Sequence, residues 1–153
     1  MKQPNPTVHN KVLWVPGTET VIGGTWYDRQ TNCAIPPRIV LNPDKTISAV
    51  LTFSKVEKFT SRGTGYAYFD GTKWSAEPTA SIEGDALRTG FPSIGVSSAG
   101  EVVSCQSNLG TTGTEVYIET RPAKGTGTWT GQKIGVMDTW TRMGLGGPDG
   151  KSI

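Results

Sequence analysis

An internal repeat limits the folds open to this chain more than any other feature of its sequence. The segment 37–47 aligns with the segment 92–102, at an offset of 55 residues (92 − 37 = 55). Both segments contain a strand-like stretch, a polar turn and the start of a second strand, which is the pattern of a β-hairpin. Trp74 and Trp129 keep the same offset (129 − 74 = 55), so the repeat extends beyond the hairpin.

A third copy begins near the end of the sequence. Residues 141–153 match the turn and strand start of the first two copies, with a shorter offset (142 − 93 = 49) that a difference in turn length explains. The repeat therefore predicts units at about 37–76, 92–131 and 141–153. Residues 1–36 are expected to form a leading segment that includes a strand of a preceding unit.

The composition favours strands and turns over helices. The chain has 20 Gly and 10 Pro, and only 35% of its residues are hydrophobic. Glycine and proline mark turns, and no long stretch has apolar residues at helical spacing. Each unit is expected to hold four strands, which in the first unit are 37–42, 46–53, 64–69 and 73–76.

Four short antiparallel strands in a repeat of this length are typical of a β-propeller blade. We therefore predict an all-β fold in which residues 1–153 form a partial β-propeller of about two four-stranded antiparallel blades plus the start of a third. Trp74 and Trp129 each follow a turn that contains glycine. Such tryptophans either pack between neighbouring blades or offer an aromatic platform to a sugar.

Charge and hydropathy argue against several classes of partner. The 15 Lys and Arg and 13 Asp and Glu give a net charge of +2 without a basic run, so we expect no nucleic-acid partner. No apolar run has the length of a membrane span, and residues 1–6 do not begin a signal peptide, so no membrane insertion is expected. Cys33 and Cys105 are too few for a disulfide framework. They are expected to be partly buried thiols, with a disulfide between them as the alternative.

The turn before the second tryptophan resembles the Asp-box, Ser-x-Asp-x-Gly-x-Thr-Trp, of sialidase-type propellers. Thr128 and Trp129 match this motif, whereas Pro122, Lys124 and Thr126 replace its Ser, Asp and Gly. In that family the box forms the turn before the last strand of a blade. The resemblance implies the same position for this turn.

Most of the chain, from about residue 20 to 153, resembles secreted bacterial sialidase-like (Asp-box, BNR-type) propeller proteins that carry a C-terminal type IX secretion sorting domain. The resemblance implies a secreted or cell-surface protein. Because the chain has no sorting domain, it looks like an N-terminal fragment whose partners include the remaining blades. The segments that carry the resemblance are 24–32, 62–71, 88–93, 124–129 and 147–150.

Arg38 and Ile39 resemble the Arg-Ile-Pro motif of sialidases, in which the arginine binds the carboxylate of the substrate, although Val40 replaces the proline. A planar guanidinium suits that carboxylate. In the family, the aspartate that acts as acid and base follows the next strand, and here Thr52 occupies that position. Because threonine cannot supply a carboxylic acid, no catalytic residue is expected in this chain.

Ligand candidates come from the same alignment of repeats. Arg38, Ser93 and Arg142 occupy equivalent positions where the innermost strand of a propeller blade begins, near the central axis. Two arginines there could form a basic funnel for an anionic glycan. Asp28 and Arg88, in expected loops, are further candidates.

No cofactor and no metal site are expected. His9 is the only histidine, and the loop Gly144–Gly147 is not followed by a helix that would hold a phosphate. The sequence predicts a non-catalytic secreted or cell-surface propeller module that binds glycan or protein at the propeller face. Two alternatives stay open: a fragment of a sialidase-type glycoside hydrolase with Arg38 as carboxylate ligand, and a structural spacer in a surface protein.

Overall fold

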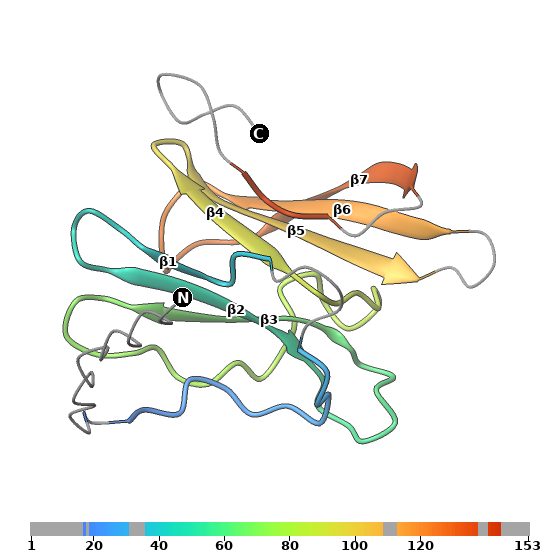
Figure 1. Ribbon diagram of the computed structural model, residues 1–153, viewed down its shortest axis with the longest axis horizontal. Helices are drawn as coiled ribbons and strands as arrows, with labels where there is room; N and C mark the ends of the chain where they lie inside the picture. Colours follow the sequence, from blue (N-terminus) through green and yellow to red (C-terminus); the bar gives the residue numbers. More distant parts are fainter. Residues whose placement is uncertain (1–16, 18, 31–35, 109–112, 138–140, 145–153) are drawn as a thin grey trace, which may run out of the picture.

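The computed structural model describes residues 17, 19–30, 36–108, 113–137 and 141–144, and within them every regular element is a β-strand. The all-β prediction is confirmed, and no helix in this part of the chain could cross a membrane. Two antiparallel sheets lie one above the other (Figure 1). The first contains β1 (Ile39–Leu41), β2 (Ile47–Phe53) and β3 (Gly63–Phe69). The second contains β4 (Ser93–Ser97), β5 (Gly100–Asn108), β6 (Thr114–Arg121) and β7 (Thr130–Met137).

The core lies between the two sheets. Val50 from β2 packs with Ile94 and Val103 from β4 and β5, and all three side chains are buried. At the edge where β1 and β4 meet, the Ile94 amide donates a hydrogen bond to the Pro37 carbonyl (2.9 Å). Alternation along each strand places these apolar side chains on the faces that the sheets turn toward each other.

The first strand of each sheet repeats at the predicted offset, whereas the second strand is shifted by one residue. Ile39 pairs with Ala49, and Ile94 pairs with Val103 (94 − 39 = 55, 103 − 49 = 54), because the second turn is one residue shorter. Each hairpin contains a residue of positive φ at its turn, Lys45 (68°) and Gly100 (123°). A Cβ atom on Gly100 would lie 2.0 Å from the Arg121 carbonyl oxygen, so this turn requires glycine.

The third strand of each sheet departs from that offset. The partner of Ala49 on β3 is Ala67, and the partner of Val103 on β6 is Glu119 (119 − 67 = 52). The reason is the connection before the third strand, which runs over 54–62 in the first sheet and over only 109–113 in the second.

The first sheet has three strands rather than the expected four. The expected strand at 73–76 is reduced to one isolated bridge between Phe69 and Trp74. In the tight turn after β3, the Asp70 carboxylate accepts hydrogen bonds from the backbone amides of Thr72 and Lys73. Pro78 follows soon after and cannot donate to a ladder, which limits pairing beyond the bridge.

The beginning of the third copy contacts the second sheet through side chains of that sheet. The amide of Met143 donates to Ser93 Oγ (2.7 Å), and the amide of Thr141 donates to Gln106 Oε1 (3.1 Å). Met143 is buried, and it stands where Ile94 stands one unit earlier (143 − 94 = 49). The remainder of that copy, 145–153, lies outside the described residues.

The described part of the leading segment runs along the side of the first sheet that is farther from the second sheet (Figure 1). It contains no strand, and the rest of it, 1–16, 18 and 31–35, lies outside the described residues. Gln30 nevertheless pairs with the backbone of Thr52, because its side-chain amide donates to the carbonyl and accepts from the amide. The Trp26 amide donates to the Ser54 carbonyl beside it.

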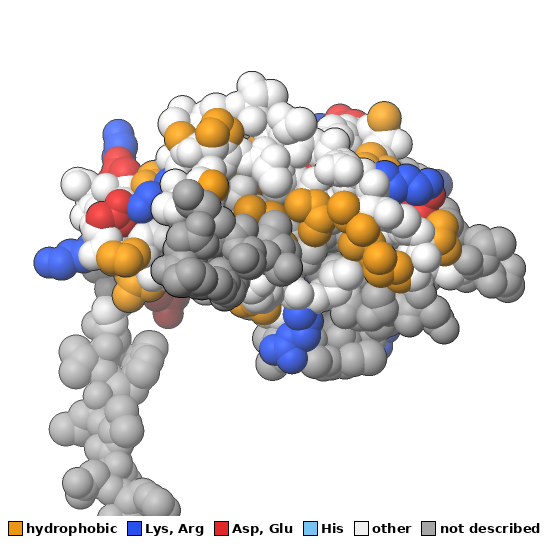
Figure 2. Space-filling model, turned by 90° about the horizontal axis from the view of Figure 1, so that it is seen from above, with side chains coloured by type: hydrophobic (Ala, Val, Ile, Leu, Met, Phe, Trp, Pro, Cys, Tyr) orange, Lys and Arg blue, Asp and Glu red, His pale blue; other side chains and the backbone are white. Residues whose placement is uncertain are grey.

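Some apolar side chains of the first sheet are exposed to solvent, whereas the equivalent side chains of the second sheet are buried or half-buried. Ile39 is 64% exposed, whereas Ile94, its equivalent at the 55-residue offset, is 1% exposed. Leu41 beside it is 70% exposed. Further exposed apolar side chains lie on β7, and Figure 2 shows such side chains in a row on the face seen from above. The face of β1 that carries Ile39 and Leu41 therefore resembles a face that packs on another sheet.

Uncovered apolar strand residues favour association between copies of a chain. We predict that the purified chain self-associates and that replacing both Ile39 and Leu41 by Lys shifts it toward the monomer, as measured by multi-angle light scattering. Val21→Lys is the matched control, because Val21 is 73% exposed but lies outside the strands. A wild-type chain that stays monodisperse and monomeric at roughly 100 μM would contradict this expectation.

Candidate functional site

A buried ion pair joins two strands of the second sheet on the side that faces the first. Glu101 on β5 and Arg121 on β6 are directly opposite in the ladder, so their side chains leave the sheet together. Glu101 is fully buried and Arg121 is 6% exposed. The guanidinium binds Glu101 Oε2 through Nε (3.0 Å) and through Nη2.

The first sheet completes the hydrogen bonds of this carboxylate. Ser48 Oγ and Tyr66 Oη both donate to Glu101 Oε1, the tyrosine at 2.6 Å. The amide of Gly125 donates to Tyr66 Oη (3.2 Å) and to Glu101 Oε2 (3.3 Å). Burial, followed by the hydrogen bond to Glu101, raises the pKa of Tyr66 far above its ordinary value, so its hydroxyl remains a donor.

Two aromatic rings enclose the guanidinium. The Arg121 Cζ atom lies 4.4 Å from the ring centroids of both Tyr66 and Trp129. The two rings meet edge to face, with centroids 5.5 Å apart and planes at 68°. A cation between two aromatic faces fixes both rings. Trp129 thus packs between the two sheets, whereas Trp74 contacts Phe69 of its own sheet.

An open cleft lies against these rings, with a volume of about 480 Å³. The segment 77–82 forms one side of it, and Tyr66, Gly127, Thr128 and Trp129 form the other. Glu77 is its one charged side chain, and no Lys or Arg is among the described residues that line it. Aromatic carbon, hydroxyl groups and a single carboxylate are suited to a ligand that is polar but carries no negative charge.

Two carboxylates and a thiol form a second cluster further along the interior. Glu119 on β6 is 3% exposed, and burial, followed by the charge of Glu83, raises its pKa to about 7. Glu83 accepts hydrogen bonds from Thr89 Oγ1 (2.8 Å) and from the Thr64 amide (2.9 Å). Cys105 is a free, fully buried thiol, and burial raises its pKa well above the ordinary value. A buried thiol with a raised pKa is a poor nucleophile.

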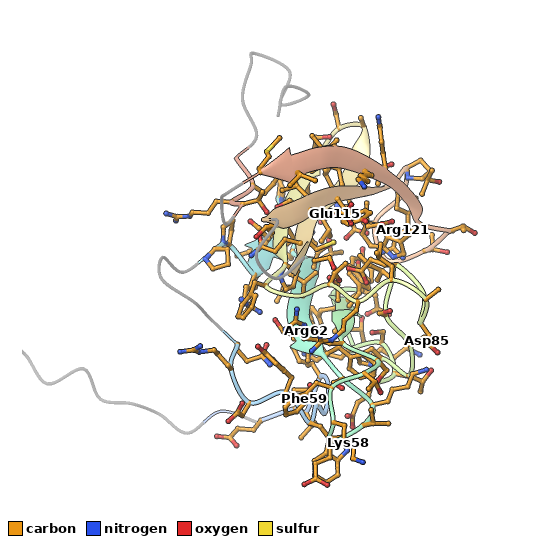
Figure 3. All side chains as sticks on the ribbon, turned by 90° about the vertical axis from the view of Figure 1, so that its right-hand side faces the viewer. Lys58, Phe59, Arg62, Asp85, Glu115 and Arg121 are labelled. Carbon is orange, nitrogen blue, oxygen red and sulfur yellow. The ribbon has the colours of Figure 1, made fainter. Side chains whose placement is uncertain are left out.

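Arg62 is a second buried arginine, and its contacts are structural. Its Nε donates to the Thr89 carbonyl (2.7 Å), and its guanidinium lies over the rings of Tyr27 and Phe91. Figure 3 shows it in the lower part of the molecule, beneath Arg121. It ties the connection before β3 to the segment that leads into β4.

The structure places the predicted ligand residues outside the cleft. Ser93 is fully buried and accepts the Met143 amide, and Arg88 is exposed and donates to the Phe59 carbonyl. Asp28 and Arg142 are exposed. Arg38 directly precedes β1, and Ser93 is the first residue of β4. Hydrogen bonds from Ile94 to Pro37 and from Met143 to Ser93 place the starts of the successive units side by side.

Arg38 differs from the other candidates because its guanidinium is only partly paired. Its Nη1 donates to Gln30 Oε1 at 3.3 Å. Its Nε and Nη2 are buried and have no hydrogen-bond partner among the described residues. These two nitrogens form the edge of a guanidinium that binds a carboxylate with two hydrogen bonds.

Thr52, at the position of the sialidase acid, has a structural role. It is fully buried, and its Oγ1 accepts a hydrogen bond from the Phe91 amide (3.0 Å). His9 and Cys33 lie outside the described residues. Within the described residues, no three His, Cys, Asp or Glu side chains come together as metal ligands. Cys105 is more deeply buried than the sequence led us to expect.

The sequence reasoning missed Glu101, Arg121 and Tyr66. The available signal was a charged residue in or next to an expected strand, which is unfavourable in a protein core unless a partner lies opposite. That signal could have pointed to Glu101 and Arg121, but it could not have named the tyrosine in the other sheet.

Comparison with known proteins supplies no assignment. No family model matches the chain, no curated protein matches it, and no solved structure matches it. The function therefore has to be argued from the geometry of the residues described above.

Breaking the buried ion pair should be costly, because Glu101 would keep a buried charge. We predict that Arg121→Met lowers the free energy of unfolding by about 3–5 kcal/mol in urea titrations. Adding Glu101→Gln should restore part of that loss. The matched control is Lys133→Met, which breaks the exposed pair with Glu115 and should cost under about 1 kcal/mol. Equal losses for the two single variants would be inconsistent with this reasoning.

Glu119 should make stability depend on pH. Below its ordinary pKa of 4.5 the carboxyl is protonated in both states, whereas between 4.5 and about 7 only the folded state holds the proton. The free energy of unfolding therefore falls as the pH rises through this window and levels off above it. Glu119→Gln should exceed the wild type by roughly 1–2 kcal/mol near pH 8 and match it near pH 4.5. The exposed Glu57→Gln should show no such difference, and parallel pH profiles for all three proteins would refute the assignment.

Proposed function

We propose that the chain is part of a β-propeller that serves as a non-catalytic binding module for glycan or protein in a secreted or cell-surface setting. The observation that supports this most is the repeated docking of one unit on the next. Ile94 packs on the first sheet next to the Pro37 carbonyl, and Met143 packs on the second sheet next to Ser93. Blades of a propeller pack face to face in this way around an axis.

The order of strands agrees with the proposal. The first strand of each sheet, β1 and β4, contact each other, and the later strands follow outward by hairpin pairing. In a propeller the first strand of each blade lies next to the axis, where ligands bind. The exposed Ile39 and Leu41 then occupy a face that a neighbouring blade would cover.

The chemistry of the interior supports a binding role rather than catalysis. Thr52 stands where a sialidase would need its acid, and its hydroxyl is engaged by a backbone amide. Glu101 is fully buried and held in an ion pair with Arg121.

Arg38 favours a second candidate, the recognition of a carboxylate-bearing sugar by a sialidase-type site. Its Nε and Nη2, which have no hydrogen-bond partner in the described part of the chain, present the edge that binds carboxylates. Burial lowers the pKa of Arg38, but an arginine remains charged at neutral pH. The later blades of such an enzyme would have to supply the nucleophile and the other arginines.

A glycan microarray and a sialidase assay separate these proposals. We expect the folded chain to bind glycans on the array. We also expect it to show no turnover of a fluorogenic sialoside above buffer. Hydrolysis that Arg38→Ala abolishes and the exposed control Arg29→Ala preserves would favour the enzyme. If a folded chain shows neither glycan binding nor turnover, the glycan-binding role is refuted, and protein binding and the structural spacer remain.

A further inference from the structure

We propose that the cleft between the two sheets binds a neutral glycan, with Trp129 and Tyr66 as its aromatic wall. This inference rests on the proposed glycan-binding function and gives it a site and a sugar class. The site is distinct from the row of strand starts at Arg38, Ser93 and Arg142, which the sequence alone favoured for an anionic ligand.

The aromatic wall is held rigid before any ligand arrives. Trp129 lies against the guanidinium of Arg121, which Glu101 holds, and Tyr66 donates to the same carboxylate. The turn that carries Trp129 is held by the Gly125 amide, which bonds to both Tyr66 and Glu101. A wall that does not have to be ordered on binding loses little conformational entropy.

The far side of the cleft supplies hydrogen-bonding groups on a short loop. Thr79 on this far side is exposed and lines the cleft, as does Thr128 beside Trp129 on the near side, so both hydroxyls are available to a ligand. Ser81 Oγ, by contrast, is engaged with the Gly84 carbonyl (3.1 Å). Sugar rings present C–H groups on one face and hydroxyls at the rim, which matches an aromatic wall opposite hydroxyl groups.

Electrostatics decide between neutral and acidic sugars. The described lining holds the carboxylate of Glu77 and neither Lys nor Arg. Arg121 lies behind the rings, 6% exposed and neutralised by Glu101. Lys124, on the same turn as Trp129, is paired with Asp44, and its hydrogen bond lowers the pKa of that carboxyl to about 2. With no free cation among the described residues of its wall, the cleft disfavours uronic or sialic acids and accepts neutral sugars.

Trp129 is a poor residue to mutate alone, because it also packs against the core between the sheets. The cleft is better tested by filling it. Ala80 lines the cleft and is exposed, so Ala80→Trp should block the ligand without disturbing the fold. Ala86 lies in the same connection before β4, is also exposed and does not line the cleft, so Ala86→Trp is the matched control.

The experiment is a microarray of neutral glycans (hexose and N-acetylhexosamine oligosaccharides) and acidic glycans (sialylated and uronate-containing), followed by titration of the best binder. We expect the wild type to prefer neutral glycans. Ala80→Trp should weaken the affinity for the best neutral glycan more than 10-fold, whereas Ala86→Trp should leave it within about 2-fold. Melting curves and circular dichroism verify that both variants are folded.

Three results would overturn the inference. Unchanged affinity in folded Ala80→Trp means that the neutral glycan binds elsewhere, and the glycan-binding function still stands. A preference for acidic glycans that Arg38→Ala abolishes and Ala80→Trp preserves assigns binding to the strand starts, again leaving the function intact. A folded wild-type chain that binds no glycan refutes both the cleft and the glycan-binding role.

Discussion

The ion pair between Glu101 and Arg121 is the interaction on which the packing of the two sheets depends. A fully buried carboxylate is tolerated only when its charge is compensated and its lone pairs are filled. The second sheet supplies the arginine, but the Tyr66 and Ser48 hydroxyls come from the first sheet. The second sheet therefore satisfies this charge only when it is docked on the first, which links burial of the core to one relative position of the sheets.

The same pair connects the packing to the surface. Arg121 holds Trp129 and Tyr66 edge to face, and the back of that arrangement is the core while its front borders the cleft. Trp129 lies on a glycine-rich turn, but its position at the cleft is fixed by the buried Arg121. The unpaired edge of Arg38 is a different kind of feature, because it belongs to the row of strand starts where successive units meet.

The sequence predicted the strands and the first hairpin of each unit because these depend on local pattern. The first strands of the two sheets fall at the predicted offset, and each of the two turns contains a residue of positive φ. The expected strand at 73–76 was wrong as a full strand, since pairing stops at the bridge of Trp74. The ligand residues chosen from sequence, such as Ser93, were placed by repeat alignment, and that alignment did not reveal that the Ser93 hydroxyl is used to bind the next unit.

The sequence by itself determined that this is an all-β chain of repeated hairpins, because alternation, turn residues and offsets are properties of neighbouring positions. Only the tertiary structure decided which polar side chains meet. Glu101, Tyr66 and Trp129 are far apart in the chain and become partners through the stacking of two sheets, whose register and relative position no local pattern contains. For the same physical reason the cleft and the raised pKa of Glu119 follow from burial, which a residue acquires only when the sheets have packed.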